Sequence, residues 1–125
     1  IPTKKHTMTI TTDQSTRNYD CSIIKNRTSY LAFIGGDNAF THINVPSNPQ
    51  ERSILVFKDS FGDAFVPYLC GHYGNIYVVD PRYFKGDLGK TMADKKLSDV
   101  LFLNSLTMVN SSTWNSMYNG LLPNN

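Results

Sequence analysis

The stretch that most constrains this chain runs from Ser53 to Gly62 and reads Ser-Ile-Leu-Val-Phe-Lys-Asp-Ser-Phe-Gly. Its apolar residues 54–57 are too few for a helix and do not alternate with polar ones, which predicts a strand covered on both faces. The polar residues after it favour a turn, and residues 64–69 favour a helix. Ser60 should therefore lie at the carboxyl edge of a sheet, beside helix N–H groups, where α/β proteins bind ligands.

The rest of the chain alternates between strand and helix patterns. Apolar runs at 76–79 and 100–103 predict two more strands, and residues 91–97 and 106–122 predict a short helix and a broken helix. Such alternation is typical of a parallel sheet with helices on its faces. We therefore predict an α/β fold with a flavodoxin-like parallel core built from strands near 54–58, 76–79 and 100–103.

The first fifty residues have a different, β-rich pattern. Strands are predicted around Met8 and Ile10, over Tyr19–Ile24, and over 42–45. The 125 residues suit a single domain, with residues 1–50 as a β-rich lead-in and 51–122 as the α/β core.

Composition excludes some functions and favours others. A net charge of +2 gives no basis for binding nucleic acid, and no apolar run is long enough to span a membrane. Glu51 is the only Glu, while Asn, Thr, Ser and Tyr are abundant, which favours an extracytoplasmic protein that meets polar ligands such as sugars. The start of the chain lacks a signal-peptide pattern, so an export signal would have been removed or would lie in sequence not given. Cys21 and Cys70 form no metal-binding pattern, and two thiols are favoured over one disulfide.

Chemically capable side chains follow the three predicted parallel strands: Ser60, Arg82 and Asn104. Because parallel strands end at one edge of a sheet, we expect the three around one pocket. Each has a simpler interpretation, since Ser60 and Asn104 could cap the following segments and Arg82 could pair with Asp80.

A nucleophilic Ser needs a base, and none is evident in the sequence. His72 should follow a helix on the opposite edge of the sheet, as part of a helix C-cap. His42 could reach the site only through a loop that the sequence does not place.

Several motifs together resemble a known family. They are Tyr-Leu-Ala-Phe-Ile-Gly-Gly-Asp at 30–37, Asp-Ser-Phe-Gly at 59–62, Phe-Val-Pro-Tyr-Leu at 65–69, His-Tyr at 72–73, and Ile-Tyr-Val-Val-Asp-Pro-Arg-Tyr-Phe at 76–84. Over about residues 28–110 the sequence resembles the C-terminal half of the DHHW family of bacterial proteins. That family is similar to SGNH-hydrolase-like proteins, which include alginate O-acetyltransferases of the cell envelope.

The resemblance implies a serine esterase or O-acetyltransferase module that acts on cell-envelope or extracellular carbohydrate without a cofactor. Ser60 matches the nucleophile and Arg82 a substrate-facing Arg, whereas Asn104 matches an oxyanion Asn only loosely. The predicted site comprises Ser60 and Asn104 as catalytic residues, and Arg82, Asp59, Gly62 and Asp80 as substrate-binding residues, with no metal. The relatives take acid and base from an upstream Asp-His motif that this sequence lacks, so the isolated chain is expected to be a fragment with little activity.

Two alternatives remain open. A non-catalytic carbohydrate-binding or envelope scaffold protein would keep the pocket without the triad. A phosphate-transfer site of the haloacid-dehalogenase kind resembles Val-Phe-Lys-Asp at 56–59, but Phe61 stands where that motif requires a second Asp.

Overall fold

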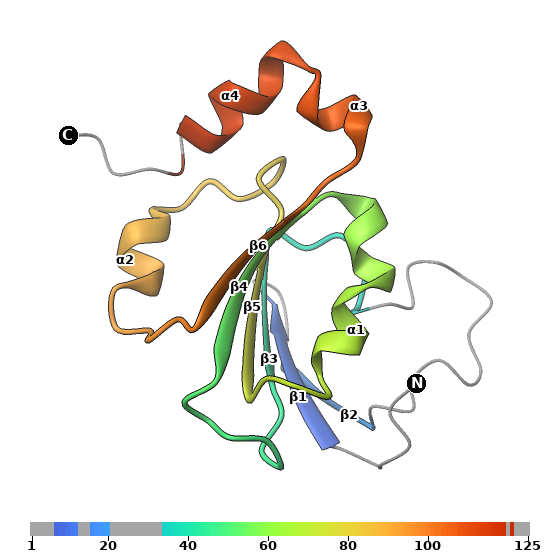
Figure 1. The fold of residues 1–125 in the computed structure, drawn as a ribbon, viewed down its shortest axis with the longest axis vertical. Helices are drawn as coiled ribbons and strands as arrows, with labels where there is room; N and C mark the ends of the chain where they lie inside the picture. The colour runs from blue at the N-terminus through green and yellow to red at the C-terminus, as the bar shows by residue number, and fades with distance from the viewer. Residues whose placement is uncertain (1–6, 13–15, 21–33, 120, 122–125) are drawn as a thin grey trace.

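The computed structural model describes residues 7–12, 16–20, 34–119 and 121, which form a six-stranded sheet with helices on both faces (Figure 1). The strands lie in the order β2-β1-β3-β5-β4-β6 across the sheet. Their bounds are β1 Thr7–Thr12, β2 Thr16–Asp20, β3 Phe40–Asn44, β4 Ser53–Lys58, β5 Asn75–Val79 and β6 Asp99–Leu103. The helices are the 3₁₀ helix η3 (Ser60–Ala64), α1 (Val66–Leu69), α2 (Leu88–Met92), α3 (Leu106–Val109) and α4 (Ser112–Asn119).

The sheet has a parallel half and an antiparallel half. β4 pairs in parallel with both β5 and β6, which confirms the three predicted core strands. β1, β2 and β3 are antiparallel to their neighbours, and β3 joins the two halves by pairing with β5. The β-rich segment thus extends the same sheet, and the mixed α/β class is confirmed.

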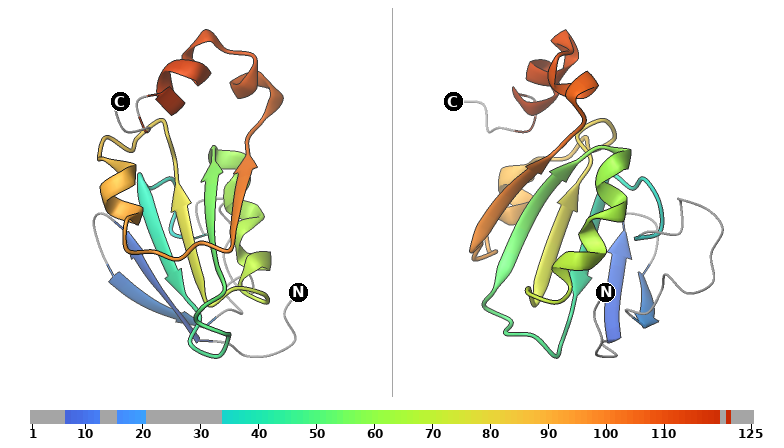
Figure 2. Two further views of the ribbon diagram at one scale, coloured as in Figure 1. Left: turned by 60° about the vertical axis from the view of Figure 1, so that its left-hand side comes forward. Right: turned by 45° about the vertical axis from the view of Figure 1, so that its right-hand side comes forward.

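β4 is buried along its whole length, as its unbroken apolar run predicts. Alternate side chains serve two cores: Ile54 and Val56 pack on the α1 face, and Leu55 and Phe57 on the α2 face. Figure 2 shows α1 and α2 on opposite sides of the sheet. Large aliphatic and aromatic side chains on both faces explain why this short strand lies in the middle of the three parallel strands, between β5 and β6.

Two boundaries differ from the sequence-based predictions. The helix predicted at 91–97 is wrong, because α2 ends at Met92 after beginning at Leu88. The Asp87 side chain caps that helix by accepting the Lys90 N–H at 2.9 Å, so the first turn forms despite the neighbouring glycines. β2 covers Thr16–Asp20 rather than 19–24, and residues 21–24 lie outside the described residues.

The carboxyl end of β6 leads to the broken helix predicted for the tail, present as α3 and α4 (Figure 2). Tyr118 of α4 and Leu121 pack with the core on the α2 face. The tail therefore lies beyond the carboxyl edge of the parallel strands, the edge at which the sequence predicted the site residues.

Candidate functional site

Ser60 is the first residue of η3 and is separated by Asp59 alone from the end of β4, the middle one of the three parallel strands. The connection from β4 to β5 passes through α1 on one face, and that from β5 to β6 passes through α2 on the other (Figure 1). In open α/β sheets the crevice between two such strand ends is where ligands bind. Ser60 therefore occupies the position predicted from the sequence, at the carboxyl edge of the sheet.

Asp59 holds the Ser60 turn rather than facing an open site. Its side chain is buried, at 2% exposure. One carboxylate oxygen accepts the Phe61 N–H at 3.0 Å, and the other accepts the Ser105 N–H at 2.7 Å. Both oxygens are thus engaged by the protein, so the geometry favours a structural role over the predicted contact with substrate.

Gly62 is required by close packing of the same turn. A Cβ atom added there would lie 2.5 Å from Lys58 Cβ, closer than real side chains approach. Its N–H donates to the Asp59 carbonyl at 3.0 Å. The Phe61 and Gly62 N–H groups are therefore both used inside the turn.

Lys58, the last residue of β4, is the centre of a buried charge network. Its ammonium lies 2.8 Å from Asp37, 2.6 Å from Asp63 and 3.3 Å from Asp80. Lys58, Asp63 and Asp80 are almost fully buried, and Asp37 is a quarter exposed. A buried ammonium needs such partners, since an unpaired charge in the interior is very costly.

The network contains more acid than base, and this sets its protonation. Three carboxylates share the ammonium of Lys58 and the guanidinium of Arg82. Burial raises the pKa of Asp63 to about 7, against the lowering effect of Lys58. Burial also acts on Asp37, but Lys58 and Arg82 outweigh it and lower the pKa of that carboxyl. One surplus carboxyl, Asp63, is therefore the member poised to carry a proton.

Arg82 directs its planar fork at Asp80. Its Nε donates to one Asp80 oxygen at 2.9 Å and its Nη2 to the other at 2.6 Å. The same Nη2 lies 3.2 Å from Asp37, and these hydrogen bonds raise the guanidinium pKa. Asp80 is fully buried and also accepts the Arg82 N–H at 3.1 Å. The simpler interpretation, an Arg paired with Asp80, thus describes the observed contacts, and substrate binding by Arg82 and Asp80 stays a prediction.

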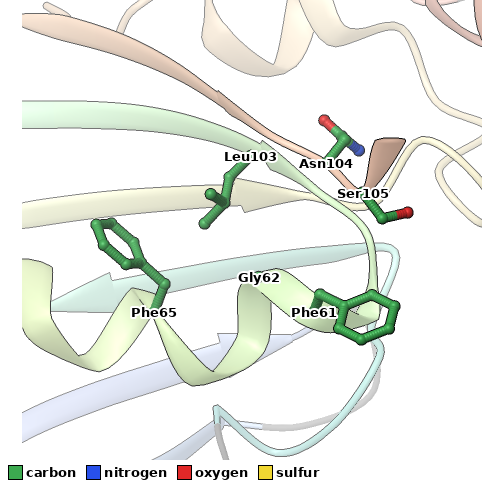
Figure 3. A pocket seen from close by; sticks show the side chains of 6 residues that line it. All are labelled: Phe61, Gly62, Phe65, Leu103, Asn104 and Ser105. Atoms are coloured by element: carbon green, nitrogen blue, oxygen red, sulfur yellow. The ribbon is translucent and has the colours of Figure 1, made fainter. Parts of the chain in front are cut away.

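Asn104 follows β6 and contacts the tail. Its Oδ1 accepts the Tyr118 hydroxyl at 3.2 Å, and its buried Nδ2 has no hydrogen-bond partner among the described residues. Burial raises the pKa of Tyr118, which keeps that hydroxyl protonated as a donor. Figure 3 shows Leu103 pointing toward the η3–α1 segment and Asn104 pointing to the other side of β6.

A groove of about 430 Å³ lies between η3, the start of α1 and the end of β6 (Figure 3). The residues around it are Phe61, Gly62, Phe65, Leu103, Asn104 and Ser105. The groove thus brings the Ser60 turn together with the Asn104 segment. Of the three residues expected around one pocket, only Asn104 is among those that line this groove; Ser60 and Arg82 are not.

The described histidines lie away from Ser60. His42 Nε2 is 2.9 Å from Oδ1 of Asn75, the first residue of β5, and its ring stacks on Tyr77. Burial lowers the His42 pKa, against the effect of the Asn75 hydrogen bond. His72 is exposed in the connection that precedes β5. His42 thus contacts the amino end of β5 and His72 precedes that end, whereas Ser60 follows the carboxyl end of the parallel strand β4. His72 is where the sequence predicted it.

Sequence reasoning missed Lys58, Asp37 and Asp63. The available signal was Lys58 itself, a charged residue that ends a strand otherwise predicted to be buried on both faces. Such a residue requires carboxylates nearby, although the sequence does not say which ones.

Other predictions can be tested only in part. Cys70 is buried, and Cys21 lies outside the described residues, so the prediction of two thiols stays open. Over the described part of the chain, no three His, Cys, Asp or Glu side chains are grouped so that they could hold a metal ion. In that same part, no helix has the length and apolar character needed to cross a membrane.

The fold and the strand–Ser–helix turn define a mixed α/β protein with a candidate serine site at the edge of its sheet. The family model described as DHHW protein matches residues 7–79, more than half of the chain. The chain therefore belongs to the DHHW family, as its motifs predicted.

Solved structures agree with this assignment. The chain is similar to a DHHW family protein from Eubacterium siraeum DSM 15702, with 28% identity and a TM-score of 0.76, over 99% of this chain and 43% of that one. It is also similar in fold to Bacillus cereus PatB1 with a sulfonyl adduct, at 23% identity and a TM-score of 0.65, over 89% and 40% of the two chains. A second PatB1 structure gives 24% identity and a TM-score of 0.63, over 89% and 39%. The chain thus spans less than half the length of these proteins, and no curated protein matches it significantly.

Proposed function

We propose that this chain carries the nucleophile of an SGNH-like serine esterase or O-acetyltransferase module that acts on acylated carbohydrate outside the cytoplasm. The observation that carries the proposal is the position of Ser60, one residue beyond the middle parallel strand, in a turn held by the two hydrogen bonds to the Asp59 carboxylate and by the buried Lys58–Asp63 ion pair. Three parallel strands with helices on both faces suit a flavodoxin-like arrangement of the SGNH kind. The DHHW assignment supports the same class.

In this proposal Ser60 Oγ attacks the acyl carbonyl of the ester. A Ser hydroxyl is a weak nucleophile until a base takes its proton, and His42 and His72 lie toward the other end of β5. The base would then be the upstream Asp-His motif of the relatives, outside this sequence. The chain alone should show only the residual acceleration of about 10³ to 10⁴ over water that binding and an oxyanion hole leave.

Asn104 is the proposed oxyanion donor. Its Nδ2 is a donor without a hydrogen-bond partner among the described residues, and its neighbour Ser105 lines the same groove as Phe61 and Gly62. An amide N–H placed at the acyl oxygen stabilises the negative charge that develops in acyl transfer. Because Nδ2 is buried, the proposal requires the Tyr118 segment to move when an acyl group binds.

Chemical rescue tests the proposal. Imidazole added with p-nitrophenyl acetate supplies a base, and intact-mass and peptide analysis should then find one acetyl group on Ser60. Ser60→Ala should abolish this labelling, whereas Ser116→Ala, which removes an exposed hydroxyl on α4, should not change it. Equal imidazole-dependent acetylation of the chain with and without the Ser60 hydroxyl would reject the nucleophile role.

The second candidate is a non-catalytic carbohydrate-binding protein. The observation that favours it is a pair of exposed aromatic rings near the strand ends, Phe61 at 74% and Tyr83 at 50% exposure, the latter with the Arg82 guanidinium 5.0 Å from its ring centre. Exposed rings of this kind offer apolar faces to sugars. Glycan binding that survives Ser60→Ala, with no acetylation of Ser60 in the rescue experiment, would favour this candidate.

A further inference from the structure

Asp59 connects the segments that follow β4 and β6, beyond the point where the backbone pairing of the two strands ends. The backbone pairing of β4 with β6 ends at Lys58 and Leu103. Beyond that pair, β4 is followed by η3, which begins at Ser60, and β6 leads through Asn104 and Ser105 to α3. The Asp59 carboxylate bridges them there, with the Phe61 N–H at 3.0 Å on one side and the Ser105 N–H at 2.7 Å on the other.

Capping alone does not explain this arrangement. The N-cap of η3 requires only the hydrogen bond from the Phe61 N–H. The hydrogen bond from Ser105 is shorter and comes from the segment after β6, 46 positions further along the chain. It extends the β4–β6 connection by one step past the last backbone pair.

The surroundings of Asp59 differ from those of the other buried aspartates. Asp63 and Asp80 lie against the Lys58 ammonium, and Asp80 also binds Arg82. The hydrogen bonds described for Asp59 come instead from backbone N–H groups, one next to Ser60 and one next to Asn104. Hydrogen bonds from backbone N–H groups to a carboxylate are short and directional, so the Asp59 carboxylate fixes the relative position of the Phe61 and Ser105 backbones.

We propose that Asp59 is the positioning residue that sets Ser60 relative to Asn104, so that nucleophile and oxyanion donor stay in register. Its catalytic meaning rests on the proposed function, but the bridge itself is a property of the fold. Asp59 acts through the backbone on either side and does not touch the substrate.

Hydrogen exchange measured by NMR tests the bridge on the chain as it is. In Asp59→Asn the carboxamide keeps the size of the side chain but accepts through one oxygen only, and its NH₂ group would face the other N–H. The amide of either Phe61 or Ser105 should exchange faster by roughly tenfold or more, and the other should change by less than about twofold. Asp87→Asn is the matched control, because Asp87 caps α2 through a single N–H, which an Asn oxygen can still accept.

Two results would overturn the bridge. One is unchanged exchange at both amides in Asp59→Asn. The other is faster exchange at both together with the β4 and β6 backbone, which would show general loosening rather than loss of one contact.

The positioning role is read from the rescue reaction. Asp59→Asn should slow imidazole-dependent acetylation of Ser60 at saturating ester by about tenfold or more, with little change in the ester concentration that gives half the rate. An unchanged rate would reject the positioning role even if the bridge is real. If unsubstituted chain is not acetylated at all, the proposed function fails, and the exchange measurement still decides the bridge.

Discussion

The two sides of β4 are built differently at its carboxyl end. Toward β5, the strand end is charged and closed, with Lys58 among three carboxylates and the fork of Arg82 on Asp80. Toward β6, it is largely apolar and open, with a groove beside Phe61 and Phe65. The Asp59 carboxylate links that side to the backbone just after β6, at Ser105.

The two sides therefore have different roles: the β5 side fixes the conformation of the Ser60 turn, and the β6 side gives a ligand access to it. On the charged side the ammonium, guanidinium and carboxylates pair with one another, which fixes the residues before and after Ser60 but leaves them little capacity for a ligand. The apolar side has exposed rings and an amide donor without a hydrogen-bond partner in the described structure. We therefore expect substitutions on the β5 side to change stability, and those on the β6 side to change binding or reactivity.

The largest expected effect is that of Lys58→Met. This change removes the ammonium but keeps a long side chain, and it leaves Asp37, Asp63 and Asp80 close together with only Arg82 to offset them. Loss of one partner from a buried ion pair costs about 3–5 kcal/mol, so urea unfolding should show a large loss or no folded protein.

Lys90→Met is the control for that loss. Lys90 is exposed and lies 3.8 Å from Asp87, so its removal should change the free energy of unfolding by less than about 1 kcal/mol. Equal effects of the two substitutions would contradict the importance of the buried network.

Within the charged network, Arg82→Lys should have a smaller effect on stability than Lys58→Met. Lysine cannot reproduce the two parallel hydrogen bonds to Asp80, so we expect a loss of about 1–2 kcal/mol in urea unfolding. Titration with an acetylated oligosaccharide should be run on the same protein. Unchanged stability with weakened glycan binding would instead support the substrate-facing role predicted from the sequence.

Titration of Asp63 should contribute to the pH dependence of the free energy of unfolding. Its folded-state pKa of about 7 lies above the ordinary value of 3.8, so the folded protein holds this proton more tightly than the unfolded chain does. The resulting stabilisation is complete at a pH below the ordinary value and is lost as pH rises through about 7. Asp63→Asn should flatten the curve between these limits.

Subtracting the pH–stability curve of Asp63→Asn from that of the unsubstituted chain isolates the contribution of Asp63 from those of other titrating groups. Asp37, with a lowered pKa, contributes stability that is lost only as pH falls below its ordinary value of 3.8. His42, with a lowered pKa, also makes the fold less stable as pH falls below its ordinary value of 6.5, which is opposite in sign to the effect of Asp63. A pH dependence that is the same with and without the Asp63 carboxyl would contradict the assignment.

The sequence predicted the backbone of the site better than its side-chain contacts. A run such as 54–57 has one stable place in a sheet, buried on both faces, so the position of Ser60 after it followed. The partners of Arg82 did not follow, because its fork fits a neighbouring Asp80 as well as a ligand. Asp37 and Asp63 contact Lys58 only because of the tertiary fold, and the spacing of these residues in the sequence does not predict the contact.

The smallest expected effect on stability is that of Phe61→Ala. Phe61 is 74% exposed beside Ser60, so losing its ring removes little buried area, and the free energy of unfolding should change by less than about 0.5 kcal/mol. Phe57→Ala is the contrasting change, since that buried ring stacks on Phe102 and should cost about 3–5 kcal/mol. If the open side of β4 meets the ligand, Phe61→Ala should nevertheless weaken binding of an acetylated oligosaccharide by several-fold, because a stacking face of about 1 kcal/mol is lost. Unchanged affinity in calorimetry would place the ligand elsewhere and remove the functional half of the contrast between the two sides.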